Sequence, residues 1–299
     1  MEVAFEKLVR SIVRLGIGGL LLVGASGELF PRICKEWYGL KDENGVFVEV
    51  PDRCHKQFDE VAKKYFGLKN ADEVTLFVNR DFYALSAGST LLPGGAVLGV
   101  PRWYLYQTKE DVENSGIQLG KYINRDSEVG VAVTKSFLPT DDMIAFTIGH
   151  ELAHIEHHLD FKTFFTFSPP LWLYLTYRVA SSTRKCFRLP VVLDALVKLC
   201  IYGFNYQAYR LAGQKVRHLA EFSADEISAK CDPRMAQGGV DHFATTLKRN
   251  AIQRVVLGEK GLECYTEEGD DIRSTSISTH PPLTERLLRV TAICDAPQD

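Results

Sequence analysis

The sequence has no cysteine framework, no excess of basic residues and no phosphate-binding glycine loop. Its seven cysteines are odd in number and none forms a CxxC pair, which argues against a set of disulfides and against a cysteine-ligated metal. The formal net charge of −3 provides no basic surface for nucleic acid, and no glycine-rich loop lies beside a helix. We therefore expect buried or free thiols and no nucleic-acid partner.

Long uninterrupted apolar runs are also missing, although three apolar stretches stand out. They cover residues 15–27, 163–177 and 189–209. A membrane-spanning helix needs about 20 mostly apolar residues; the first two stretches are shorter, and the third carries Asp194 and Lys198. These two residues lie four apart and can pair on one helix face, which lowers the cost of placing them in lipid. Hydropathy alone leaves core helices and membrane helices as open alternatives.

A histidine pair with metal-ligand spacing lies in the middle of a predicted helix. This helix has Thr140 as its expected N-cap, and its apolar residues recur at helical spacing. Positions four apart stack on one helix face, so His150 and His154 can present two imidazoles to one metal. Glu151 then lies beside them as a base for the attacking water. The alternative is an amphipathic helix that carries these residues without a metal.

A second predicted helix can supply the third ligand. Arg217, Glu221 and Asp225 recur every four residues, which by itself is also typical of a solvated stripe of salt bridges. Taken with the histidine pair, the pattern predicts one zinc ion per chain, held by His150, His154 and Glu221 with a fourth position open. Asp225 is placed to accept a hydrogen bond from a ligand imidazole, and Arg217 is a further supporting side chain.

These segments resemble the integral-membrane zinc peptidases typified by HtpX and the CaaX prenyl protease. The resemblance rests on the sequences HELAH at 150–154, ExxAD at 221–225 and STHPPL at 278–283, followed by Glu285 and Arg286. It implies hydrolysis of peptide bonds, with Glu151 as the base and with His280 and Arg286 near the developing oxyanion. The alternative for residues 279–282 is a rigid turn.

The resemblance extends to an upstream strand that lines the active-site cleft in that family. Phe82-Tyr83-Ala84 followed by the PGG sequence at 93–95 carries this match. It implies that substrate backbone adds as a strand beside Ala96, Val97 and Leu98. A mostly polar stretch at 106–140 departs from the family pattern, in which this link is usually short.

A larger part of the chain resembles the transmembrane protein 177 family. Residues 86–101, 163–209 and 238–266 carry this second resemblance. It implies a multi-pass protein of the mitochondrial inner membrane that acts in the maturation of cytochrome c oxidase subunit 2. The implied partners are membrane lipid and an unfolded or newly inserted membrane protein, such as subunit 2 with its chaperone. Some family members lack the HExxH sequence, so a non-catalytic assembly factor is the alternative function.

The predicted fold is α+β and mostly helical, a gluzincin-like metallopeptidase domain with membrane-associated helices. Residues 1–30 form an N-terminal membrane segment, and residues 31–299 form the metallopeptidase-like domain, interrupted by a helical membrane hairpin at about 163–209. Residues 168–170, Ser-Pro-Pro, predict the start of the hairpin's first helix. Periodicity predicts further helices at 52–66 and 241–257 and strands at 74–82 and 96–100.

Positive charges predict the topology of these membrane segments. One cluster precedes the first segment and another lies between the second and the third; they are Lys7, Arg10 and Arg14, and Arg178, Arg184, Lys185 and Arg188. The positive-inside rule places both clusters on one side of the membrane and the catalytic parts on the other. If the inside is the mitochondrial matrix, the catalytic parts face the intermembrane space. Glu2 and Glu6 are atypical of a transit peptide.

Overall fold

The computed structural model describes residues 2–68, 73–115, 124, 126–157, 159–187, 189–272 and 280–296. Arg188 of the second positive cluster and residue 279 of the predicted turn lie outside this part. The fold is α+β and mostly helical, as predicted. Its helices are α1 (Glu2–Leu29), α2 (Pro31–Tyr38), α3 (Asp52–Lys64), the 3-10 helix η2 (Arg102–Leu105), α4 (Lys109–Asn114), α5 (Glu128–Lys135), α6 (Asp141–Glu156), α7 (Leu159–Phe187), α8 (Val191–Cys231), α9 (Pro233–Val256), α10 (Glu259–Cys264) and α12 (Leu283–Cys294).

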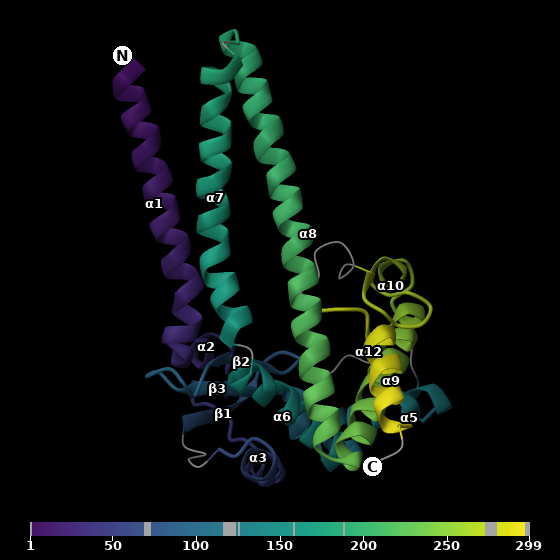
Figure 1. Cartoon of the computed structure of the whole chain (residues 1–299). Helices are drawn as coiled ribbons and strands as arrows, with labels where there is room; N and C mark the ends of the chain where they lie inside the picture. The colour runs from purple at the N-terminus through teal and green to yellow at the C-terminus, as the bar shows by residue number, and fades with distance from the viewer. Residues whose placement is uncertain are drawn as a thin grey trace.

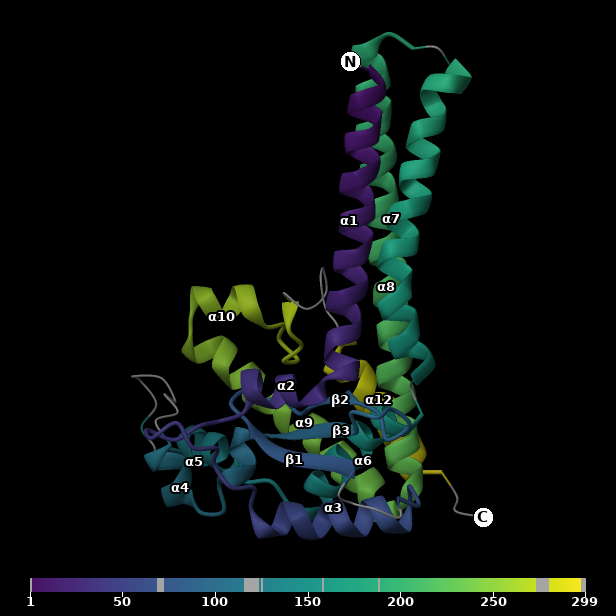
Figure 2. The same ribbon diagram turned by 90° about the vertical axis from the view of Figure 1, so that its left-hand side faces the viewer.

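Three long helices, α1, α7 and α8, stand side by side and project from the rest of the molecule (Figures 1 and 2). We call them the stalk. Among the described helices, only α1, over Ser11–Leu29, is long and apolar enough by composition to cross a membrane. The predicted pair on α8 is present, since Lys198 Nζ lies 2.6 Å from Asp194 Oδ2. Thr183 of α7 donates to the other oxygen of Asp194 at 3.0 Å and so ties α7 to α8.

The prediction that the first hairpin helix begins at residues 168–170 is wrong. Helix α7 starts at Leu159 and continues through both prolines. The prolines remove two backbone donors, but packing on both sides compensates. Thr166 donates to the Gly24 carbonyl of α1 at 3.3 Å, and the Ser168 hydroxyl lies 3.2 Å from that of Tyr209 on α8. Neighbouring helices therefore hold the proline-containing turn in helical form.

A three-stranded sheet lies at the base of the stalk (Figure 2). Its strands are β1 (Val74–Asn79), β2 (Leu85–Gly88) and β3 (Ala96–Pro101), in the order β1-β3-β2. The predicted strand at 74–82 ends early, because the Asn79 amide donates to the Tyr83 carbonyl at 2.8 Å and closes a turn. Strand β2 was not predicted, since its sequence, Leu-Ser-Ala-Gly, lacks the β-branched and aromatic residues that mark strands.

The position of β3 contradicts the prediction that substrate adds beside Ala96, Val97 and Leu98. These residues pair in parallel with Val74–Leu76 of β1 and antiparallel with Ser86–Gly88 of β2. Both hydrogen-bonding edges of β3 are thus occupied. The sequence pattern identified a strand but not its neighbours, and β2 supplies an outer edge of the sheet.

Helix α6 forms the centre of the core, between α3, α8, α9 and the sheet. Helix α9 begins at Pro233, earlier than the predicted residue 241, because Asp232 caps it and proline suits its first position. Two glycines in this added part let α9 approach α6 closely. A Cβ at Gly238 would lie 2.2 Å from the Asp142 carbonyl oxygen, and one at Gly239 would lie 2.7 Å from the Phe146 ring. These close approaches fix the packing of α9 against α6, the helix that carries both histidines of the candidate site.

Candidate metal centre

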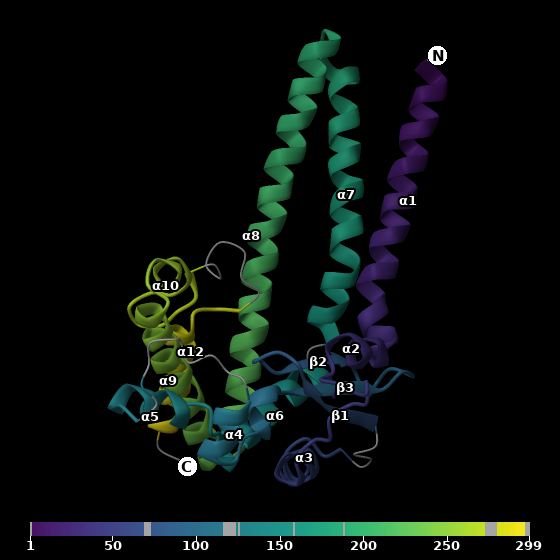
Figure 3. The ribbon, with the colours of Figure 1, turned by 180° about the vertical axis from the view of Figure 1, so that it is seen from behind.

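Helices α6 and α8 bring the predicted ligands together. Thr140 caps α6 as predicted and accepts from the Met143 amide at 3.2 Å. Helix α8 is continuous from the tip of the stalk to the core (Figure 3). Its close approach to α6 is possible because Gly149 has no side chain: a Cβ there would lie 2.5 Å from Ser228 Oγ. Ser228 in turn donates to the Phe146 carbonyl at 2.7 Å, which fixes the rotation of α8 against α6.

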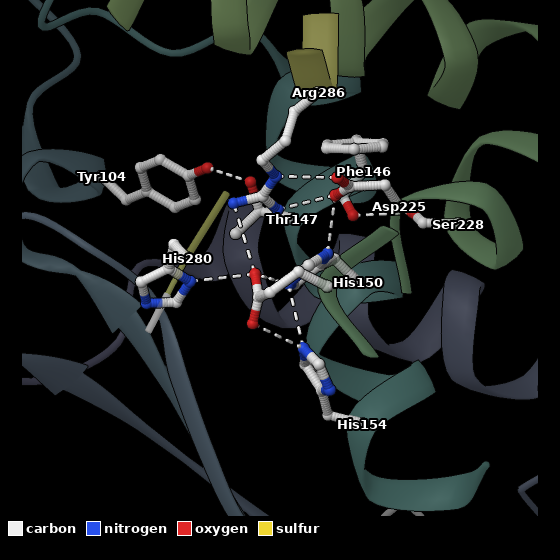
Figure 4. Close-up of polar contacts among 10 residues, drawn as sticks. Tyr104, Phe146, Thr147, His150, His154, Asp225, Ser228, His280 and Arg286 are labelled. Carbon is white, nitrogen blue, oxygen red and sulfur yellow. Dashed lines mark hydrogen bonds and ion pairs between the residues drawn. The ribbon is translucent and has the colours of Figure 1, made fainter. Parts of the chain in front are cut away.

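Three side chains form a cluster with the geometry of a zinc site. The Nε2 atoms of His150 and His154 lie 3.2 Å apart. Figure 4 shows the two imidazoles facing one another. Glu221 Oε2 lies 3.6 Å from His150 Nε2, and Glu221 Oε1 lies 3.4 Å from His154 Nε2. Ligand atoms at 2.0–2.1 Å from a tetrahedral zinc are separated by about 3.4 Å. The donor set and its spacing therefore fit zinc, and these three residues would hold it.

Asp225 and Arg286 lie directly behind the ligand cluster. His150 Nδ1 lies 2.9 Å from Asp225 Oδ1. Arg286 donates to both oxygens of Asp225 at 2.7 Å, and its Nη1 lies 3.3 Å from Glu221 Oε2 (Figure 4). This geometry makes Asp225 the partner of a ligand imidazole. It favours an orienting role for Arg286 over the expected one at the oxyanion, because the guanidinium is engaged by two carboxylates.

The remaining predicted residues occupy different positions. His280 Nδ1 lies 2.9 Å from Glu221 Oε2, and the His280 side chain is half exposed. Arg217 packs its guanidinium over the Phe165 ring of α7, 5.0 Å from the centroid. The structure therefore brings His280 to the cluster and directs Arg217 towards the stalk.

Burial and charge together set the ionisation of the cluster. Burial lowers the pKa of His150, but its contacts with Asp225 and Glu221 outweigh this and raise the pKa to about 10. Burial raises the pKa of Glu221, but contacts with His150, His154 and His280 hold it well below its ordinary value. The pKa of Asp225 is lowered as well, because Arg286 outweighs the effect of burial. In the metal-free protein both carboxylates are thus ionised and His150 is protonated at neutral pH, so binding of a metal would release the His150 proton.

Two cavities meet at the cluster. The first, of about 720 Å³, extends along α9 and the end of β3, and the second, of about 420 Å³, reaches α1 and α7 of the stalk. Glu151, Glu221 and His280 line both. A polar face of α9, which the sequence pattern did not predict as part of the site, lines the first cavity. Its residues are His242, Thr246, Arg249 and Asn250, and their helical spacing was the only available signal.

Residues 53–293 match peptidase family M48, which is most of the chain. The chain belongs to peptidase family M48. This M48 protein is also similar to transmembrane protein 177 of Danio rerio, with 23% identity over 281 residues, 90% of this chain and 88% of the relative. Transmembrane protein 177 of Mus musculus is 25% identical over 288 residues, which cover 95% of this chain and 92% of the relative. Transmembrane protein 177 of Homo sapiens is 24% identical over 288 residues, with the same coverage of both chains.

The predicted relation of this M48 protein to metallopeptidases and to transmembrane protein 177 is confirmed by these matches. No solved structure matches it.

Proposed function

We propose that this protein is a membrane-bound zinc metalloendopeptidase. The observation that carries the proposal is the cluster of His150, His154 and Glu221, whose ligand atoms lie within 4.8 Å of one another, beside the buried carboxylate of Glu151. When bound, zinc polarises the scissile carbonyl and lowers the pKa of a water molecule to about 7.

The protein's own side chains perform the proton transfers and orient the site. Glu151 takes the proton of the attacking water and delivers it to the leaving amine. Asp225 holds the His150 imidazole in the tautomer that leaves Nε2 free for the metal. His280 lies at the junction of the two cavities, where it can donate a hydrogen bond to the developing oxyanion.

The two cavities support cleavage within a chain. Because Glu151 lines both, an extended peptide can continue past the reacting bond in either direction. Tyr83 and Ala84 also line both cavities, and Leu85 and Ser86 of the edge strand β2 line the second. Substrate backbone would pair with this edge. Recognition through backbone groups requires little of the substrate's side chains.

We further propose that the stalk anchors the protein in the mitochondrial inner membrane as a multi-pass protein. Large apolar side chains of α7 and α8 are exposed, among them Phe167, Leu171, Leu199 and Phe204, and lipid would cover them. The relatives are named transmembrane proteins. The second cavity opens at the base of the stalk, where a newly inserted membrane protein would arrive. Cytochrome c oxidase subunit 2, with its chaperone, is the substrate that the family resemblance suggests.

A second candidate function is that of a non-catalytic assembly factor. The exposed apolar surface of the stalk favours it, because such a surface can bind and shield newly inserted helices without cutting them. This role would need the stalk but not Glu151.

We expect the purified full-length protein in detergent to hold about one zinc ion per chain and to cleave an unfolded protein such as casein. A chelator should stop cleavage and added zinc should restore it. His154→Ala should lose the metal, measured by elemental analysis, because two ligands remain of three. His157→Ala is the matched control, since this exposed residue follows the same helix. Metal-free wild-type protein that still cleaves casein would contradict the proposal.

We expect the α7–α8 connection and the N-terminus to lie in the matrix and the C-terminus in the intermembrane space. The N-terminal end of α1 and the ends of α7 and α8 that this connection joins lie at the same end of the stalk, away from the globular part (Figures 1 and 2). Both segments carry positive charge in the sequence. A C-terminal tag should be degraded by protease in mitoplasts but protected in intact mitochondria, whereas a tag in the connection should be protected in both. A C-terminal tag that resists protease in mitoplasts would reverse this orientation.

A further inference from the structure

The first cavity contains a buried positive charge that the site described above does not use. Arg249 of α9 is 7% exposed. Among the described residues it takes part in no ion pair, and its Nη1 atom is buried without a hydrogen-bond partner. Burial lowers the pKa of this guanidinium to about 10, so it remains charged at neutral pH. Within the described part of the chain, Arg249 is therefore a desolvated cation whose Nη1 atom has no acceptor.

The other arginine that is buried in the described part of the chain, Arg286, has acceptors. Arg286 is paired with Asp225. Arg53 donates to the carbonyls of Tyr104 and Tyr106, both at 2.9 Å. An unpaired buried charge is costly, so the buried guanidinium of Arg249, which has no carboxylate partner among the described residues, needs an explanation.

Aromatic rings hold Arg249 in place without satisfying it. Its guanidinium carbon lies 5.3 Å from the Trp103 ring centroid and 4.8 Å from that of Phe137. Such cation–π contacts stabilise a cation from its flat faces. They leave Nη1, at the edge of the guanidinium, without an acceptor among the described residues. The edge is the part that binds a carboxylate through two parallel hydrogen bonds.

The cavity connects Arg249 to the reacting groups. Arg249 and Glu151 line the same space. His242 lies two helical turns before Arg249 on α9, and its ring centroid is 6.4 Å from that of Phe146. The Phe146 centroid is 6.5 Å from that of His150. A peptide held at Glu151 can therefore place a group near Arg249.

We propose that Arg249 binds a carboxylate of the peptide substrate, at a position away from the scissile bond within the first cavity. This inference rests on the proposed peptidase function and adds to it a class of substrate. The carboxylate is either the side chain of a Glu or Asp residue or the C-terminal carboxylate of the substrate. The walls of this cavity combine the rings of Trp103, Phe146 and Phe243 with the polar face of α9.

Peptide binding to the zinc-loaded, full-length Glu151→Gln protein tests the proposal without turnover. The probes are fluorescent, water-soluble ten-residue peptides in which one Glu, or Gln in its place, is moved along an otherwise uncharged sequence. Each is made with a C-terminal acid and with a C-terminal amide. We expect one carboxylate form to bind at least about 30-fold more tightly than its amide counterpart, as measured by fluorescence anisotropy. Whether the preferred form carries Glu or the terminal acid identifies the source of the carboxylate.

Substitutions at Arg249 assign this preference to its guanidinium. Arg249→Met should abolish the preference, and Arg249→Lys should retain part of it, because the charge stays while the paired hydrogen bonds are lost. Lys248→Met is the matched control: it removes one positive charge from the neighbouring, exposed position of the same helix. Zinc content and circular dichroism verify that each variant is folded. The preference is also measured in the Glu151→Gln protein with Arg249 unchanged, where no substitution on α9 can disturb folding.

Two results would overturn the proposal: equal binding of acid and amide peptides, or a preference that survives in Arg249→Met. The outcome is separable from that of the proposed function. Cleavage of casein by wild-type protein without any carboxylate preference would leave the peptidase standing and remove the role of Arg249. A carboxylate preference that depends on Arg249, in a protein that cleaves nothing, would leave a peptide-binding site and remove the peptidase.

Discussion

Replacing Glu151 with Gln should remove nearly all peptide hydrolysis and leave zinc binding and folding intact. The substitution keeps the size and polarity of this buried side chain, but a neutral amide cannot accept the proton of the attacking water. General-base catalysis is typically worth 10²–10⁴-fold in rate, and we expect a loss of about that size. The measurement is cleavage of casein by protein with matched zinc content.

The same substitution separates the peptidase from the assembly factor. The exposed apolar surface of the stalk is unchanged in Glu151→Gln, so a scaffold would work as before. Rescue of oxidase-subunit maturation in cells that lack the protein is the second measurement. Glu156→Gln, at the end of the same helix, is the control for the chemical change itself. Full rescue by Glu151→Gln, together with no cleavage by wild type, would defeat the peptidase proposal and favour the second function.

The metal cluster could be predicted because its geometry is mostly local. The spacing of His150 and His154 on one helix fixes their relative positions before any tertiary contact forms. Glu221 was predictable from its own helical pattern and from the family resemblance. The pattern did not predict how α6 and α8 come together. Their close approach depends on the contact of Gly149 with Ser228.

Features that depend on neighbours in space were missed or misassigned. β3 has the alternation and composition of a strand, but nothing in its sequence shows that β2 occupies one of its edges. The prolines of α7 favour a helix start locally, and only contacts with α1 and α8 reverse that preference. Arg249 reads as an ordinary surface charge on an amphipathic helix. Its burial between Trp103 and Phe137 brings together segments far apart in the sequence.

The second large effect should come from the buried charges behind the metal cluster. Asp225→Ala leaves Arg286 buried without its carboxylate partner and His150 without a group to orient it. Removing one member of a buried ion pair costs about 3–5 kcal/mol, and we expect the metal-free protein to lose that much stability. Zinc affinity should fall as well, because the imidazole orientation is no longer fixed. Denaturant unfolding and zinc titration measure the two effects.

A double substitution shows whether the loss comes from the stranded charge or from the missing packing of Asp225. In Asp225→Ala/Arg286→Leu no guanidinium remains to be desolvated, so this protein should be more stable than Asp225→Ala alone, although it has lost one more native side chain. Glu226→Ala is the matched control on α8, since its partner Lys230 is exposed and surface pairs contribute little. Arg286→Leu is also measured alone. If the losses of unfolding free energy in Asp225→Ala and Arg286→Leu simply add in the double variant, Asp225 and Arg286 are not coupled, and the charge behind the ligands does not stabilise the site. If the double variant regains stability but not zinc affinity, the pair acts on the metal through the orientation of His150, as its geometry indicates.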